Sequence, residues 1–329
     1  MSLYRPLTIG SLKLPGNLFL APVAGYTDRA FRSICAEKGA DFSFTELVSA
    51  EALCRNTHNY ISGKSAALVK RGLKEKLYCI QLFGANRDVL GRACTLLAPL
   101  EPDAVDLNAG CPVPKVIKTG AGSALMQDPG NLGRIIESMV QSSRESLGGI
   151  PITVKMRSGW DSSSINYAEC ARIAAEAGAA MVSLHPRTRA QGYSGKSNWL
   201  HISDLASRLS VPVCGSGDLY TPEDARLLLA ETKCAALMFA RGAMGNPFIF
   251  SMTKSLLNNE KWELPSREEK LKTALRHLEM LADDVGEKSA CLEMRKQFCA
   301  YTKGITGGAA LREKLVRAQT IGKYREIVL

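Results

Sequence analysis

The first two-thirds of the chain alternates short apolar runs with longer stretches of helical periodicity. This alternation is typical of βα units, in which helices join parallel strands. Eight apolar runs of this kind occur, and eight parallel strands close into a (β/α)8 barrel. We therefore predict an α/β fold, specifically a TIM barrel. The predicted strands are Leu18–Ala21, Phe42–Thr45, Tyr78–Phe83, Ala104–Leu107, Ile152–Met156, Met181–Leu184, Val211–Cys214 and Ala236–Ala240.

Helical patterns separate these runs, and several begin with a capping residue. Thr221, for example, precedes Pro222, a residue favoured at the first helical position. An open doubly wound sheet is the alternative architecture. A GxGxxG turn after the first strand would favour it, but residues 21–25 are Ala-Pro-Val-Ala-Gly. The predicted helices include Asp88–Ala98, Leu132–Ser146, Tyr167–Ala177 and Pro222–Ala230.

A second, smaller domain is predicted after the barrel, because the β-type runs stop beyond Phe250. Residues 266–327 have helical patterns, with breaks at Gly286 and at Gly304–Gly308. We predict a barrel domain over 1–258 and an all-helical domain over 259–329. Residues 292–329 contain eight Lys or Arg against three acidic residues, half of the chain's net charge of +10. This excess is compatible with a polyanionic partner such as RNA, and equally with solubility alone.

The cysteine pattern and the N-terminus indicate a reduced, cytoplasmic protein. Ten cysteines lie scattered through the chain without a CxxC pair, unlike a short disulfide-rich secreted domain. Residues 1–17 lack the charged start and apolar stretch of a signal peptide. No run approaches the roughly 18 apolar residues of a membrane helix, so no membrane association is expected. We expect a monomer.

Polar and glycine residues recur where the predicted strands end, and the active site of a barrel lies at that end. One such residue is more often structural, but a converging ring of them indicates a site. The turns after strands seven and eight of such barrels often hold a phosphate with backbone N–H groups. Here those turns are Gly215–Asp218 and Arg241-Gly242. The other strand-end residues include Pro22, Glu46, Gln81, Asn108, Lys155, Arg157, His185, Arg187 and Arg189.

Cys111 is the chemical candidate, as nucleophile, acid or metal ligand. Neither a second Cys nor a His lies nearby at metal spacing, so no metal site is expected. A free thiol, with a pKa near 8.5, keeps its proton at neutral pH, which suits proton donation. Lys155 lies on the fifth predicted strand, near the barrel mouth, where its positive charge could stabilise a flavin ring that is negatively charged when reduced. The alternative for Lys155 is a plain ion pair with Glu46 or Asp106.

These motifs resemble those of the tRNA-dihydrouridine synthases over nearly the whole chain. The most specific part joins Asp106-Leu107-Asn108-Ala109-Gly110-Cys111-Pro112 to the later run His185-Pro186-Arg187-Thr188-Arg189. The C-terminal segments Met294–Lys296 and Tyr301–Gly304 resemble the bacterial B-type subgroup. The sequence departs from the family at Val23, Pro186 and Ser216, where Met, Gly and Asn are usual.

The resemblance implies an oxidoreductase that reduces specific uridines in tRNA to 5,6-dihydrouridine. NADPH would reduce FMN, a hydride would pass to C6 of the uracil, and Cys111 would protonate C5. The base would have to leave its stack, with Asn108, Arg187 and Arg189 holding its polar edge. Arg295 and Lys296 would contact the RNA. FMN would contact Pro22, Val23, Ala24, Gln81, Lys155, His185, Ser216, Gly217, Asp218, Ala240 and Arg241.

Two other functions are open on the residues alone. An FMN barrel acting on a free pyrimidine, like a dihydroorotate dehydrogenase, explains the barrel but not the basic helical domain. A non-catalytic RNA-binding protein gives no reason for Cys111 and Lys155 at strand ends. The preference for NADPH over NADH rests on the resemblance alone.

Overall fold

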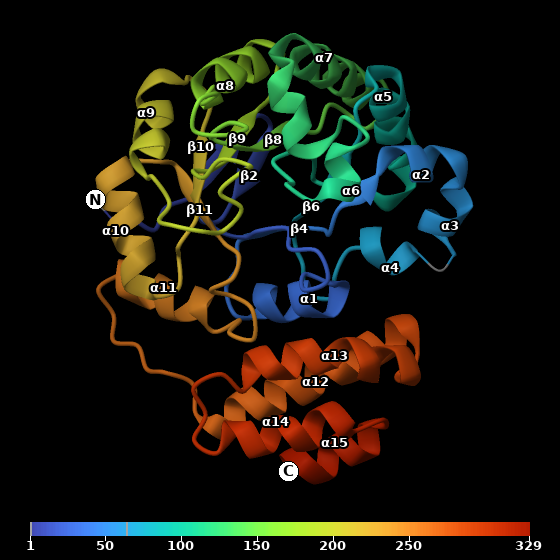
Figure 1. Cartoon of the computed structure of the whole chain (residues 1–329), viewed down its shortest axis with the longest axis vertical. Helices are drawn as coiled ribbons and strands as arrows, with labels where there is room; N and C mark the ends of the chain where they lie inside the picture. The colour runs from blue at the N-terminus through green and yellow to red at the C-terminus, as the bar shows by residue number, and fades with distance from the viewer. Residues whose placement is uncertain (1, 64) are drawn as a thin grey trace.

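A closed ring of eight parallel strands forms the centre of the molecule, in a computed structural model that describes residues 2–63 and 65–329. The strands pair in the order β3-β4-β6-β7-β8-β9-β10-β11, and β11 pairs with β3 to close the ring. The predicted TIM barrel is therefore confirmed (Figure 1). The barrel strands are β3 (Leu18–Leu20), β4 (Phe42–Phe44), β6 (Tyr78–Phe83), β7 (Ala104–Ala109), β8 (Ile152–Arg157), β9 (Met181–His185), β10 (Val213–Ser216) and β11 (Ala236–Phe239).

Helices surround the barrel, as the alternating pattern predicts (Figure 1). Every predicted barrel strand is present, with ends that differ from the prediction by at most two residues. Thr221 caps its helix in a capping box with Asp224. The helices of this part are α1 (Arg29–Glu37), α2 (Ala50–Arg55), α3 (Thr57–Ile61), α4 (Ala66–Val69), α5 (Arg87–Leu96), α6 (Pro114–Ile117), α7 (Pro129–Ser146), α8 (Tyr167–Glu176), α9 (Leu200–Arg208), α10 (Pro222–Thr232) and α11 (Ile249–Leu257), with 3-10 turns η1 (Ala98–Leu100) and η2 (Gly122–Gln127).

An N-terminal hairpin, absent from the sequence prediction, covers one end of the barrel. It consists of β1 (Leu7–Ile9) and β2 (Leu12–Leu14), paired antiparallel. Ile9 and Leu14 belong to the same buried cluster as inward-facing barrel residues such as Phe19. The hairpin thus closes the barrel end opposite the strand C-termini. A further short strand, β5 (Val48–Ser49), pairs with β6.

The C-terminal region forms a helical unit of two layers beside the barrel (Figure 1). The inner layer docks on α1, where His277 Nε2 lies 3.1 Å from Asp28 and Arg29 Nη1 lies 2.7 Å from Asp284. The predicted breaks at 286 and 304–308 are present, and a third break at 318–320 is additional. Among the described residues, no helix combines the length and apolarity needed to cross a bilayer. The inner helices are α12 (Arg267–Val285) and α13 (Glu287–Tyr301), and the outer ones are α14 (Gly308–Arg317) and α15 (Ile321–Val328).

Candidate active site

A cavity of about 460 Å³ opens where the barrel strands end. Its volume lies within the range of small-molecule and cofactor sites. It gathers residues from strands far apart in the sequence, as the strand-end pattern predicts. Of the predicted site residues it is lined by Pro22, Val23, Ala24, Asn108, Cys111, Lys155, His185, Ser216, Gly217, Asp218, Ala240 and Arg241.

Cys111 lies in this cavity as a nearly buried thiol, 9% exposed. Its backbone N–H donates to Asn108 Oδ1 at 2.9 Å, and its carbonyl accepts from Ser123 Oγ at 3.0 Å. Burial raises the pKa of the thiol, against the opposing effects of the Val113 N–H and of Arg157. The loop therefore holds a thiol that keeps its proton at neutral pH.

Two cations on β8 flank the thiol. Burial and the nearby charge of Arg157 lower the pKa of Lys155 to about 8, although Asp106 opposes this shift. Arg157 holds the Cys111 loop, because its Nε donates to the carbonyl of Gly110 at 2.8 Å. Sequence analysis placed Arg157 in the ring of strand-end residues but gave it no contact with cofactor or substrate. The signal was available, since residues two apart on a strand face the same side, and Lys155 was already included.

His185 has a buried ring nitrogen without a protein partner. Its Nε2 makes no hydrogen bond within residues 2–63 and 65–329. Burial, with Lys155 and Arg157 nearby, lowers the pKa of His185 to about 2, so the ring is neutral. Because buried polar atoms are nearly always hydrogen-bonded, this nitrogen marks a place for a ligand atom.

The turn after β10 contains two consecutive residues with positive φ. Gly217 has φ +102°, and a Cβ at this position would collide with Ser197. Asp218 follows at φ +56°. Its carboxylate accepts from Arg187 Nη2 at 2.8 Å and from Arg241 Nη2 at 3.1 Å. These guanidinium groups neutralise the charge of the Asp218 carboxylate.

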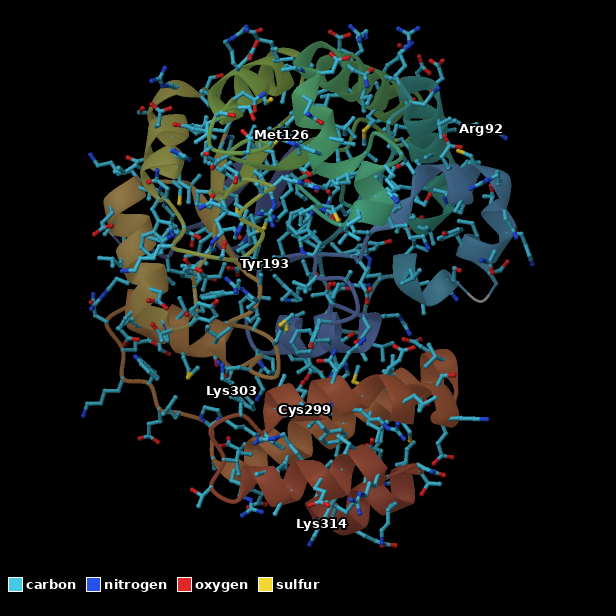
Figure 2. The ribbon with its side chains drawn as sticks, in the orientation of Figure 1. Arg92, Met126, Tyr193, Cys299, Lys303 and Lys314 are labelled. Carbon is cyan, nitrogen blue, oxygen red and sulfur yellow. The ribbon has the colours of Figure 1, made fainter. Side chains whose placement is uncertain are left out.

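Two tyrosines that sequence reasoning missed lie beside Arg241 in the cavity. The Arg241 guanidinium lies 4.8 Å from the ring centroid of Tyr193 and 5.3 Å from that of Tyr220. Both rings line the cavity, and Figure 2 shows Tyr193 over the face of the barrel. Tyr193 is 59% exposed, so a ligand can contact its ring. Only the fold brings these loop residues to Arg241.

Two predicted site residues lie behind the cavity wall. Gln81 is fully buried, with its amide hydrogen-bonded to Asp106 and Asn108. Arg187 is 2% exposed and is engaged by Asp218, by Ser197 Oγ at 2.8 Å and by two carbonyls. The structure therefore places Arg187 behind the cavity wall, where it supports the turn after β10.

The other three predicted contacts lie around the cavity. The Arg189 guanidinium stacks over Trp160, 4.4 Å from the ring centroid. Lys296, on α13, places its Nζ 5.6 Å from the ring centroid of Tyr26, which lines the cavity. The neighbouring Arg295 is half-buried, and its Nε is buried without a partner in the described part of the chain. Lys296 thus brings a cation of the helical unit to the mouth of the barrel.

Comparisons with known proteins agree with the motifs. The family model for dihydrouridine synthase (Dus) matches residues 19–327. A probable tRNA-dihydrouridine synthase of Treponema pallidum is 45% identical, covering 99% of this chain and 96% of that protein. The tRNA-dihydrouridine synthase B of Pasteurella multocida is 32% identical, covering 93% of this chain and 90% of that protein.

Solved structures show the same fold at low identity. A variant of NCR from Zymomonas mobilis aligns with a TM-score of 0.53 at 14% identity, covering 82% of this chain and 95% of that one. Histamine dehydrogenase from Rhizobium sp. 4-9 aligns with a TM-score of 0.57 at 15% identity, covering 84% of this chain and 51% of that one. At such identities these structures support the fold alone. The family match, in contrast, spans nearly the whole sequence, and this chain belongs to the dihydrouridine synthase family of oxidoreductases.

Proposed function

We propose that this protein reduces uridines in tRNA to 5,6-dihydrouridine, with FMN as its cofactor and NADPH as the reductant. The observation that carries the proposal is the nearly buried Cys111 thiol, which shares one cavity with Asn108 and Lys155. Addition of a hydride to C6 and a proton to C5 saturates the C5–C6 double bond of uracil. The cavity supplies a proton donor for the second of these additions.

The residues of the cavity fit a flavin mononucleotide. Lys155 and the unpartnered Nε2 of His185 offer polar contacts to a ring system, while Pro22 to Ala24 offer apolar surface. Arg241 and the turn Ser216–Asp218 would hold the phosphate. Gln81, which lies behind the cavity wall, would act on the site through Asn108, whose amide it orients. When bound and reduced, FMN supplies the hydride that adds to C6.

The protein's own groups perform the proton chemistry. Cys111 donates its proton to C5, and the raised pKa of this thiol keeps the donor loaded at neutral pH. Asn108 Nδ2 gives one hydrogen to Gln81, which leaves a second hydrogen for a carbonyl oxygen of the base. Arg189, at the rim, would contact the RNA around the base. Arg187 would act through the turn that it holds.

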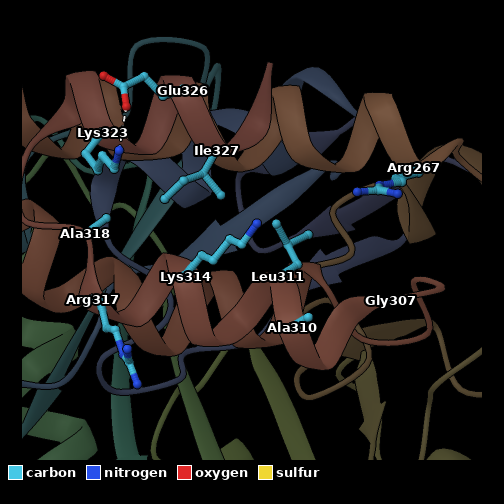
Figure 3. A pocket seen from close by; sticks show the side chains of 10 residues that line it. All are labelled: Arg267, Gly307, Ala310, Leu311, Lys314, Arg317, Ala318, Lys323, Glu326 and Ile327. Atoms are coloured by element: carbon cyan, nitrogen blue, oxygen red, sulfur yellow. Dashed lines mark hydrogen bonds and ion pairs between the residues drawn. The ribbon is translucent and has the colours of Figure 1, made fainter.

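We propose that residues 1–258 form the catalytic domain and that residues 259–329 bind tRNA. Lys296 supports this assignment, because it joins the helical unit to the mouth of the barrel. Arg295 would contribute charge beside it. A basic groove of about 700 Å³ lies farther out, between α14 and α15 (Figure 3). Its cations offer contacts to backbone phosphates: Arg267, Lys314, Arg317 and Lys323.

A cytoplasmic monomer is also proposed. All ten cysteines are free thiols, as a reducing compartment favours. Sedimentation analysis of the purified protein tests the monomer, and a stable dimer would contradict it.

The decisive experiment compares substrates. Purified protein with FMN and NADPH is incubated in separate reactions with unmodified tRNA, with free uridine and with orotate, the oxidised form of dihydroorotate. We expect reduction of the tRNA uridines and no reduction of free uridine or orotate. Turnover of a free pyrimidine without tRNA turnover would favour the free-pyrimidine enzyme. RNA binding without any turnover would favour a non-catalytic protein.

A further inference from the structure

An unbroken chain of hydrogen bonds runs from the carboxylate of Asp106 to the backbone of Cys111. Asp106 Oδ2 accepts from Gln81 Nε2 at 2.7 Å, and Gln81 Oε1 accepts from Asn108 Nδ2 at 2.9 Å. Asn108 Oδ1 then accepts from the N–H of Cys111 at 2.9 Å and from that of Gly110 at 3.1 Å. Two side-chain amides therefore connect a buried acid to the loop that carries the thiol.

The two ends of this chain determine the direction of every hydrogen bond in it. An ionised carboxylate only accepts, so Gln81 must present its NH2 group to Asp106. Its oxygen then faces Asn108, which must donate. At the other end, backbone N–H groups only donate, so Asn108 must present its oxygen to Cys111. The Asp106 carboxylate at one end and the backbone N–H groups at the other therefore require the same orientation of both amides, so no hydrogen bond in the chain conflicts with another.

Asp106 is held in place to perform this role. It is fully buried on β7, and its Oδ1 accepts from Thr153 Oγ1 at 2.6 Å. Burial raises the pKa of Asp106 to about 6, although the bonds from Thr153 and Gln81 oppose the rise. The group is therefore mainly ionised at neutral pH. An ionised acid in a barrel interior requires hydrogen-bonded partners, and the two donors provide them.

We propose that Asp106 is a positioning residue for Cys111, acting through the oriented amides of Gln81 and Asn108. The chain of bonds keeps the Cys111 loop closed and turns a free N–H of Asn108, not its oxygen, toward the cavity. A site that presents a donor here selects a carbonyl oxygen of its substrate. This second consequence rests on the proposed function, whereas the closed loop does not.

The test measures how fast iodoacetamide alkylates Cys111 in the full-length protein, quantified on the Cys111 peptide by mass spectrometry. Cys299 is exposed and serves as the internal reference in the same sample. Asp106→Leu removes the acceptor that orients both amides. Without that anchor the loop opens more often, so alkylation of Cys111 relative to Cys299 should rise about two- to tenfold, the factor that one hydrogen bond supplies.

Two further variants make the result specific. Gln81→Leu breaks the chain in its middle and should produce a similar rise, even if Asp106→Leu does not fold. Thr153→Val removes the other donor to the same carboxylate and leaves the path to Cys111 intact, so its ratio should stay near that of the wild type. The proposal would be overturned if the ratio of Cys111 to Cys299 alkylation were unchanged in both Leu variants. It would also be overturned if Thr153→Val raised this ratio as much as the Leu variants do.

A second measurement connects the loop to the chemistry. Asp106→Leu should slow uridine reduction in a single turnover. The same change should cause little further slowing in a Cys111→Ala background, because the effects of residues that act together are not additive. Full additivity would overturn the role of Asp106 through Cys111. Alkylation requires neither FMN nor RNA. If the wild type reduced no uridine, the proposed function would fail while the alkylation result stood.

Discussion

Arg187 Nη2 lies 2.8 and 2.9 Å from the two carboxylate oxygens of Asp218, and this ion pair supports the turn after β10. Because Arg187 is nearly inaccessible, its removal should act on the turn and not on the base. Arg187→Met leaves the Asp218 carboxylate paired with Arg241 alone, beside the proposed phosphate position. We predict that the dissociation constant for FMN rises at least about tenfold, or roughly 1.4 kcal/mol.

Fluorescence titration of FMN measures this effect, with Arg208→Met as the matched control. Arg208 also pairs with an aspartate, Asp204, but it lies exposed on α9. The control should bind FMN like the wild type. If Arg187→Met instead kept its FMN affinity and lost only affinity for tRNA, the predicted contact of Arg187 with the base would be restored.

The Cys111→Ala variant separates the two halves of the reaction. The flavin contacts remain, so the protein should stay yellow and NADPH should still reduce it. Dihydrouridine formation should fall by about 10²–10⁴-fold, the usual contribution of a general acid. Cys111→Ser should recover little, since a hydroxyl is a much weaker acid. Stopped-flow flavin reduction and mass analysis of tRNA measure the two halves; near-normal dihydrouridine formation would remove Cys111 from the mechanism.

Lys155 should make FMN binding depend on pH. The pKa of Lys155 is about 8, so the ammonium is charged below that pH and neutral above it. A bound anion favours the charged form, so FMN affinity should decrease as pH rises above about 8. Titrations between pH 7.5 and 9 keep the FMN phosphate doubly ionised, because its second pKa is near 6. Lys155→Met should bind more weakly without this decrease; an equal decrease would assign the effect to another group.

Breaking the ion pair between Arg32 and Glu75 should lower the free energy of unfolding of the barrel. Both side chains are fully buried, and Arg32 Nε lies 2.9 Å from Glu75 Oε1. Arg32→Met leaves a buried carboxylate without its cation, which typically costs about 3–5 kcal/mol. Thermal melts should show a Tm lower by several degrees, and adding Glu75→Gln should recover part of the loss. The exposed pair of Arg172 with Glu176 is the control, where Arg172→Met should change stability by less than about 1 kcal/mol.

The sequence predicts the barrel well because each strand is an apolar run of several residues bounded by turn residues. The β1–β2 hairpin escaped prediction because each strand has three residues, too few to show a period. Strand ends meet at one mouth in any such barrel, which is why residues such as Cys111, Lys155 and His185 were found together.

What the sequence could not show is which polar side chains face each other. Arg187 was expected to hold the base, but its partner Asp218 lies 31 positions away on another turn. The one role that the sequence suggested for Asp106 was that of a counterion for Lys155. Its hydrogen bonds to Thr153 and Gln81 depend on the register of β6, β7 and β8. Pairing across strands is a property of the folded barrel.

RNA binding provides the last prediction, and it concerns Lys296 and Lys303 on the helical unit. Both are exposed, and Figure 2 shows Lys303 on the side of the unit that faces the barrel. Each lost phosphate contact flattens the dependence of log K on log salt by about 0.7–0.9. The double change of both lysines to Gln should therefore flatten the slope by roughly 1.4–1.8. Arg295 is left unchanged because it is half-buried.

The matched control changes Arg172 and Arg208 to Gln, which removes the same charge from exposed positions on α8 and α9. Its slope should equal that of the wild type, since these helices lie on the barrel wall and not at its mouth. Adding Lys314→Gln to the lysine pair tests whether RNA extends to the groove between α14 and α15, where Lys314 lies (Figure 3). A further flattening of about 0.7–0.9 is expected if it does. Equal slopes for the lysine pair and the control pair would mean that the net charge alone, and not this surface, attracts the RNA.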